Sequence, residues 1–216
     1  MGNWERKYPL CVCKEKERPF REIKYFADFL RKKGIIKGKI LDLGCGYGIE
    51  SLYLANLGFD VTGIDINNEA IKYARKKAHN KKNIKFICGD ALKFEKKLKP
   101  NSFDMVIDSA FSHTLRKKER VKNIRDIYKI LKKNGWLFFF NFSNEDEYCK
   151  KYCPKRRWTF RKGIRLYCHF FTKEEIRKLL KNFNIIKWKI VKGKPSKDLL
   201  KVINSRNLFV LYVSKE

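Results

Sequence analysis

Three glycines and two acids in one short stretch have the types and spacing to hold a nucleoside-like ligand. The run D-L-G-C-G-Y-G places Gly44, Gly46 and Gly48 just after Asp42, and Asp65 follows about twenty residues further on. Glycine lets the backbone approach a ligand closely and accepts positive φ angles, and the first N–H groups of a helix attract polar ligand atoms. An acid at the end of the next strand can accept hydrogen bonds from both hydroxyls of a ribose.

Two cofactor classes use such a loop: dinucleotides and S-adenosylmethionine. The dinucleotide fingerprint G-x-G-x-x-G fails, because counting from Gly44 its last position is Ile49. The charge of Asp42 adds a second argument, since a carboxylate beside the loop attracts an ammonium and a sulfonium and repels a pyrophosphate. The sequence therefore predicts S-adenosylmethionine as the cofactor and S-adenosylhomocysteine as its product.

The segments around the loop alternate between strand and helix patterns. Strands are predicted over 39–43, 59–65, 84–88, 103–107, 136–142, 185–191 and 207–213. Helices are predicted over 20–33, 49–57, 69–82 with Asn68 as the cap, 115–131, and 172–182 with a Thr172/Glu175 capping box. In the 115–131 helix we expect Val121, Ile124, Tyr128 and Leu131 on one face. The alternation indicates an α/β fold, with a parallel sheet covered on both faces and a final antiparallel hairpin.

Four motifs resemble the class I S-adenosylmethionine-dependent methyltransferases and occur in that family's order. L-D-L-G-C-G-Y-G and V-T-G-I-D are similar to its first two motifs, I-C-G-D-A (87–91) to its third, and F-D-M-V-I-D-S-A-F-S-H (103–113) to its fourth. The resemblance covers about residues 20–213. It implies a Rossmann-like, seven-stranded, mostly parallel sheet with helices on both faces and an antiparallel last strand.

The resemblance also implies roles for individual residues. It implies that the amino-acid part of the cofactor lies at Asp42, Gly44, Cys45, Gly46 and Gly48, the ribose at Asp65 and Ile66, and the adenine at Asp90 and Ala91, with Asp108 completing the set. Asp108, Ser109 and His113 are then expected to face the methyl group as the catalytic residues.

The fourth motif bears on the substrate. Relatives that methylate amines of nucleic-acid bases carry [DN]-P-P-[YFW] there, whereas this chain has Asp108-Ser109-Ala110-Phe111. The pattern D-S-x-x-x-H instead resembles small-molecule members, including those near thiopurine and tellurite-resistance methyltransferases. Methyl transfer is an in-line displacement, and a base helps only when the nucleophile arrives protonated. His113 is the expected base because its pKa can be set near neutrality, and a purely structural histidine is the alternative.

The net charge and one basic insertion leave the substrate open. The chain has 52 Lys and Arg against 23 Asp and Glu, a formal charge of +29, which attracts polyanions. The alternative to an anionic partner is a genome-wide or temperature-related bias towards lysine, although such a bias usually raises the Glu content as well. Residues 148–171 hold eight Lys or Arg, seven aromatics and no acid, and we expect 157–161 and 164–169 to pair as a hairpin. This insertion follows the fifth predicted strand, so we expect it to lie beside the carboxyl ends of the strands and to cap the substrate site. The alternative is a solvated hairpin.

The sequence as a whole predicts one domain over 1–216, with an N-terminal lid and helix in 1–34 and a substrate cap in 144–171. Trp4 and Tyr8 are candidates for the lid or for core packing. No membrane span or signal peptide is evident, so we expect a cytoplasmic protein. We expect a small-molecule substrate; RNA methylation and a non-catalytic cofactor-binding module are the two alternatives.

Seven cysteines in such a protein indicate thiols rather than disulfides. Cys45 and Cys88 are expected to fill the core. The pairs Cys11/Cys13 and Cys149/Cys153 could together offer four thiolates to zinc, but neither has the usual C-x-x-C spacing. No metal site is therefore expected.

Overall fold

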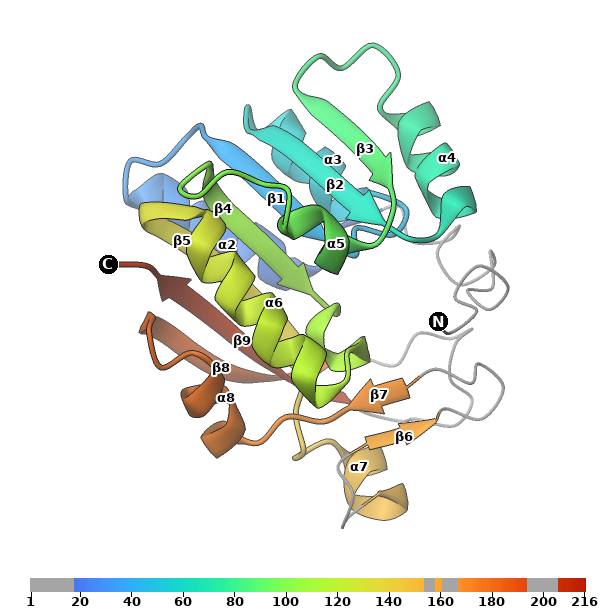
Figure 1. The fold of residues 1–216 in the computed structure, drawn as a ribbon, viewed down its shortest axis with the longest axis vertical. Helices are drawn as coiled ribbons and strands as arrows, with labels where there is room; N and C mark the ends of the chain where they lie inside the picture. The colour runs from blue at the N-terminus through green and yellow to red at the C-terminus, as the bar shows by residue number, and fades with distance from the viewer. Residues whose placement is uncertain (1–17, 154–157, 161–166, 194–205) are drawn as a thin grey trace.

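The structure, a computed structural model, describes residues 18–153, 158–160, 167–193 and 206–216. Seven strands form one sheet in the order β3-β2-β1-β4-β5-β9-β8 (Figure 1). Their bounds are β1 (Lys39–Leu43), β2 (Asp60–Asp65), β3 (Ile84–Cys88), β4 (Phe103–Ser109), β5 (Leu131–Phe142), β8 (Asn184–Gly193) and β9 (Arg206–Ser214). β9 runs antiparallel to both β5 and β8, and the first five strands pair in parallel. The predicted seven-stranded, Rossmann-like sheet with an antiparallel last strand is confirmed.

Two helical layers cover the sheet because the central strands are apolar on both faces. On one face, α2 (Arg21–Lys32) and α3 (Ile49–Asn56) share a buried cluster with Phe138 and Phe140 of β5. On the other, α5 (Ala91–Glu95), α6 (Lys117–Ile130) and α8 (Lys173–Leu179) share one with Leu137 and Phe139. Figure 1 shows α6 in front of the sheet and α2 behind it. α4 (Asn68–Lys77) packs near the glycine loop through Ile71 and Ala74, which contact Cys45.

The strand register brings the sequence motifs to one edge of the sheet. β1 lies between β2 and β4, with Leu43 level with Ile64 on one side and Asp108 on the other. Parallel strands end at a common edge, so the glycine loop after β1, Asp65 at the end of β2 and the segment after β4 lie together. β1 is also where the strand order reverses, the point at which open α/β sheets bind ligands.

The 144–171 insertion forms a small subdomain beside that edge. It contains α7 (Glu147–Tyr152) and the antiparallel pair β6 (Trp158–Phe160) and β7 (Tyr167–His169). The predicted hairpin is thus confirmed, and its turn lies outside the described residues. β7 packs against the 3-10 turn η1 (Ser112–Thr114) that follows β4. Trp4, Tyr8, Cys11 and Cys13 also lie outside the described residues.

Several local predictions were wrong. The cap of α4 is Asn67, whose side chain accepts from Ala70 N at 3.0 Å, and the helix ends at Lys77. Cys88 is exposed, because it ends the edge strand β3, where no neighbouring strand covers it. Val121 was placed on one face with Ile124, which is buried, but Val121 itself is 54% exposed because its part of α6 borders an open groove.

The capping box at α8 is only half formed. Thr172 Oγ1 accepts from Glu175 N at 3.1 Å as predicted, whereas the Glu175 carboxylate makes ion pairs elsewhere. None of the helices in the described part of the chain is long and apolar enough to cross a membrane.

Candidate functional site

The glycine loop takes a conformation that only glycine adopts easily. Gly44, Gly46 and Gly48 have φ angles of +65°, +52° and +73°. A Cβ added at Gly44 would lie 2.7 Å from the Phe111 ring, and one at Gly48 would lie 2.4 Å from the Phe86 ring. At Gly46 a Cβ would meet no atom within 4 Å. Two glycines therefore permit close packing, and the middle one leaves open space in which a ligand can approach the backbone.

Asp65 connects the loop to the next helix. Its carboxylate accepts from Gly46 N at 2.9 Å and from Asn67 N at 2.8 Å. Burial raises the pKa of Asp65, and these backbone hydrogen bonds oppose the rise. A carboxylate has about four acceptor positions, so capacity remains for the hydroxyls of a ribose. The neighbouring Ile66 is 41% exposed, an apolar side chain open to solvent beside this acid.

Asp42 is buried at the same edge. It is 2% exposed, and its carboxyl group accepts from Ser51 Oγ at 2.5 Å. Burial raises its pKa to about 8, and the charges of Glu50, Asp65 and Asp108 act in the same direction. The sequence argument treated Asp42 as an ionised carboxylate. In the ligand-free chain it is instead mostly protonated below that pH, and ionises readily only when a cation approaches.

The third motif forms the start of α5. Asp90 caps this helix, since its carboxylate accepts from Leu92 N at 2.9 Å, and Ala91 is 5% exposed. Cys45 lies in the buried cluster with Ile71 and Phe86, which confirms it as a core filler. Only its backbone can then contribute to ligand binding, and its N–H already donates to Ile64 O at 3.0 Å.

Asp108 is fully buried and organises the segment after β4. Its carboxylate accepts from Ser112 N at 2.9 Å, from Ser112 Oγ at 2.5 Å and from Asn141 Nδ2 at 3.0 Å. Burial raises its pKa, and these bonds oppose the rise. Asp108 thus shapes the turn rather than projecting into the site. Ser109 ends β4 and is partly exposed.

His113 is the predicted base, and the structure places it on η1, 9% exposed. Its ring packs on Phe142 with centroids 4.4 Å apart, and its Nδ1 lies 3.2 Å from Asn141 Oδ1. Ala110, just before η1, has a φ of +60°. Such a backbone angle is uncommon for a residue with a side chain and tends to occur at functional sites.

Sequence reasoning missed Asn141 and Ala110. Asn141 did leave a signal, because it is the one amide in the apolar strand W-L-F-F-F-N-F (136–142). A polar side chain in such a strand needs a buried partner. The positive φ of Ala110 left no comparable signal.

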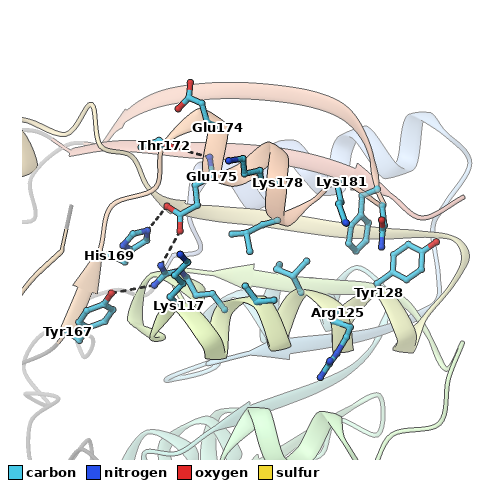
Figure 2. A pocket seen from close by; sticks show the side chains of 16 residues that line it. Lys117, Arg125, Tyr128, Tyr167, His169, Thr172, Glu174, Glu175, Lys178 and Lys181 are labelled. Carbon is cyan, nitrogen blue, oxygen red and sulfur yellow. Dashed lines mark hydrogen bonds and ion pairs between the residues drawn. The ribbon is translucent and has the colours of Figure 1, made fainter. Parts of the chain in front are cut away.

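A groove of about 890 Å³ lies on the helical face between α6 and α8 (Figure 2). One end is closed by buried Arg120, whose guanidinium lies 3.0 Å from Glu175, and by His169, 2.7 Å from the same carboxylate. Lys117, Arg125, Lys178 and Lys181 line its walls. Because 52 of the 216 residues are Lys or Arg, these basic walls do not by themselves single out an anionic ligand.

Three cysteines of the insertion lie in one buried cluster. They are Cys149, Cys153 and Cys168. Burial raises the pKa of Cys149 to about 12, and the nearby thiols add to this, so the group is uncharged. Within the ranges that the structure describes, no group of three or more His, Cys, Asp or Glu is arranged to hold a metal ion.

The central part of the chain matches a protein-family model. Residues 41–139 match the model of a methyltransferase domain. A putative methyltransferase, YqeM of Bacillus subtilis, is 32% identical over 109 residues, which are 48% of this chain and 42% of YqeM. A 23S rRNA (uracil-C5)-methyltransferase of Pyrococcus abyssi is 48% identical over 54 residues, 24% of this chain and 13% of that protein. The chain thus spans less than half the length of these two relatives.

Solved structures match nearly the whole described fold. A SAM-dependent methyltransferase of Methanosarcina mazei has a TM-score of 0.74 at 24% identity, covering 92% of this chain and 98% of its own. TehB of Haemophilus influenzae has a TM-score of 0.71 at 19% identity, and the match covers 94% of this chain and 65% of TehB. A Burkholderia thailandensis didemethyltoxoflavin N1-methyltransferase, crystallised with S-adenosylhomocysteine, has a TM-score of 0.68 at 17% identity, covering 95% and 82%. These structures confirm the fold that the sequence motifs implied.

Proposed function

We propose that this chain, which carries a methyltransferase domain in the class I fold, transfers a methyl group from S-adenosylmethionine to a small, anionic or soft nucleophilic acceptor. The observation that carries the cofactor is electrostatic. In a chain with a formal charge of +29, four acids gather at one sheet edge, where burial and then the charges of Glu50, Asp65 and Asp108 raise the pKa of Asp42. Such a cluster of acids favours a ligand whose ammonium and sulfonium can stabilise their ionised forms.

The geometry of the loop supports the same cofactor. The open space at Gly46 can admit its amino-acid part, and the remaining acceptor capacity of Asp65 matches the two ribose hydroxyls. The exposed Ile66 side chain offers an apolar contact next to the ribose, and Asp90 and Ala91 remain the residues expected for the adenine. When bound, the cofactor supplies an activated methyl group, and the chain's residues place the acceptor against it in a dry pocket.

The position of the insertion supports a small acceptor. β7 packs against η1, and Phe170 stacks on Phe142 at 5.7 Å, the same ring that packs on His113. The expected base therefore packs on an aromatic ring of β5 that the insertion covers with Phe170. The D-S-A-F segment also lacks the two prolines of relatives that methylate base amines.

RNA is the second candidate substrate. It is favoured by the +29 charge and by the 54-residue match to an rRNA methyltransferase. That match covers only 24% of this chain and 13% of the rRNA methyltransferase. We therefore rank RNA below a small acceptor.

Two measurements test the proposal. Calorimetry should detect S-adenosylhomocysteine binding and no binding of NAD; the reverse result would refute the cofactor assignment. Labelled S-adenosylmethionine is then incubated with the protein and with cell extract separated into RNA and small molecules. Label in the small-molecule fraction supports the proposed acceptor, and label in RNA supports the second candidate. Cofactor binding without transfer to any fraction indicates a non-catalytic binding module.

A further inference from the structure

Asn141 is a fully buried amide that joins the predicted base to Asp108. Its Oδ1 accepts from His113 N at 3.0 Å and lies 3.2 Å from His113 Nδ1. Its Nδ2 donates to Asp108 Oδ1 at 3.0 Å and to the main-chain carbonyl of Asp108 at 3.4 Å. His113 and Asn141 are 28 residues apart and meet because β4 and β5 are paired.

Two main-chain groups fix which way this amide points. The backbone N–H of His113 can only donate, so it requires the amide oxygen. The backbone carbonyl of Asp108 can only accept, so it requires the amide nitrogen. Rotating the Asn141 amide by half a turn would place two donors together at one end and two acceptors at the other. The oxygen therefore faces His113 Nδ1.

We propose that Asn141 is a positioning residue that holds neutral His113 as its Nδ1–H tautomer and so leaves the basic lone pair on Nε2. An oxygen at Nδ1 requires a hydrogen there, and a neutral imidazole carries only one, so the basic lone pair lies on Nε2. Phe142 packs on the ring at 4.4 Å and restrains its plane.

The network behind Asn141 holds it in place. Asp108 Oδ1 accepts from both Asn141 and the Ser112 backbone, and Asp108 Oδ2 accepts from Ser112 Oγ. The chain Ser112–Asp108–Asn141–His113 thus transmits the orientation of a buried carboxyl group to the imidazole. Asp108, expected from the sequence to face the methyl group, acts here through Asn141. The catalytic consequence rests on the proposed function, whereas the tautomer does not.

Nitrogen NMR of histidine-labelled protein tests the proposal without an acceptor. The full chain has three histidines, so loss of one set of signals in His113→Gln assigns His113. At about pH 8, above the ordinary pKa of histidine, we expect its proton on Nδ1 and none on Nε2. His169 is an internal control of opposite sense, since its Nε2 lies 2.7 Å from the Glu175 carboxylate and should carry hydrogen. A wild-type spectrum with His113 protonated at Nε2 would overturn the proposal.

Two variants separate positioning from packing. Asn141→Asp keeps an acceptor beside Nδ1 and should retain the tautomer, whereas Asn141→Leu removes it and should shift His113 toward Nε2–H. An unchanged tautomer in a folded Asn141→Leu protein contradicts the role of Asn141. Thermal unfolding and S-adenosylhomocysteine binding check the fold, and if neither variant folds the wild-type spectrum still decides. If His113 is the Nδ1–H tautomer but the protein methylates no acceptor, the inference about Asn141 holds and the proposed function is refuted.

Discussion

Replacing Asp65 by alanine tests the link between the glycine loop and the ribose. The carboxylate ends β2, and two backbone N–H groups, of Gly46 and Asn67, donate to it at 2.9 and 2.8 Å. A hydrogen bond to a charged group contributes about 1.5–3 kcal/mol. Loss of the ribose acceptor should therefore weaken S-adenosylhomocysteine binding by about ten-fold to a hundred-fold.

The same substitution should also destabilise the ligand-free protein. Gly46 and Asn67 lose their acceptor, and the structure offers partial compensation from water because Asp65 is only partly buried. A loss of about 1–3 kcal/mol in the free energy of unfolding is expected. Calorimetry gives the affinity, and urea unfolding gives the stability.

Asp60→Ala is the matched control. Asp60 begins the same strand at its other end and is exposed, so both affinity and stability should stay near wild type. Unchanged affinity in folded Asp65→Ala would refute the assignment of the ribose to this edge. Equal losses in the two variants would show that the effect comes from β2 as a whole rather than from the carboxylate.

Three further perturbations test other parts of the structure. Burial raises the pKa of Asp42 to about 8, above its ordinary 3.8, so this group makes the ligand-free fold less stable as pH rises between these values. If the ammonium group of S-adenosylhomocysteine pairs with ionised Asp42, binding must release the Asp42 proton, and the affinity should rise by up to about tenfold per pH unit from about pH 6 to 8. Asp42→Asn should flatten this slope in calorimetry. Gly48→Ala combines a φ of +73° with a Cβ 2.4 Å from the Phe86 ring and should cost about 2–4 kcal/mol in urea unfolding; a near-neutral result contradicts the packing of the loop. Burial opposes ionisation of Glu175, but His169 at 2.7 Å and the buried Arg120 outweigh burial and lower the pKa of Glu175. The ionised carboxylate therefore stabilises the fold above about pH 4.5, and this stabilisation is lost as the pH falls through the lowered pKa. Glu175→Gln should destabilise the protein more at pH 7 than at pH 3, and a loss of stability that does not depend on pH would disprove this linkage.

Local sequence patterns were sufficient for the order of the elements and for the cofactor loop. Strand β1, the glycines after it and Asp65 at the end of β2 are close in sequence, and their types alone predict a β-loop-α-β unit. The capping residue Thr172 and the apolar stripe of α2 were likewise visible, because caps and helical periodicity depend on neighbours within a few residues. The predicted hairpin in the insertion was found for the same reason.

Positions that depend on packing between distant elements were not predictable in this way. Val121 fits the apolar stripe of α6, yet it is exposed because α6 and α8 leave a groove between them. Cys88 has the pattern of a core residue, but it ends an edge strand, and the sequence alone does not show which strand is at the edge. The Glu175 carboxylate does not complete the capping box, because it pairs with Arg120 on α6 and His169 on β7 instead.

The sequence by itself determined the fold class, the loop and which residues could do the chemistry. Only the tertiary structure decided how these residues are protonated and which groups they hydrogen-bond to. Asp42 changes from an assumed carboxylate to a mostly protonated acid because burial in the fold, and then the charges of neighbouring acids, raise its pKa. His113 acquires a defined proton position because β4 and β5 bring Asn141 to it across 28 residues. Residue type is local, whereas burial, hydrogen-bond partners and hence protonation depend on elements that meet only when the sheet has formed.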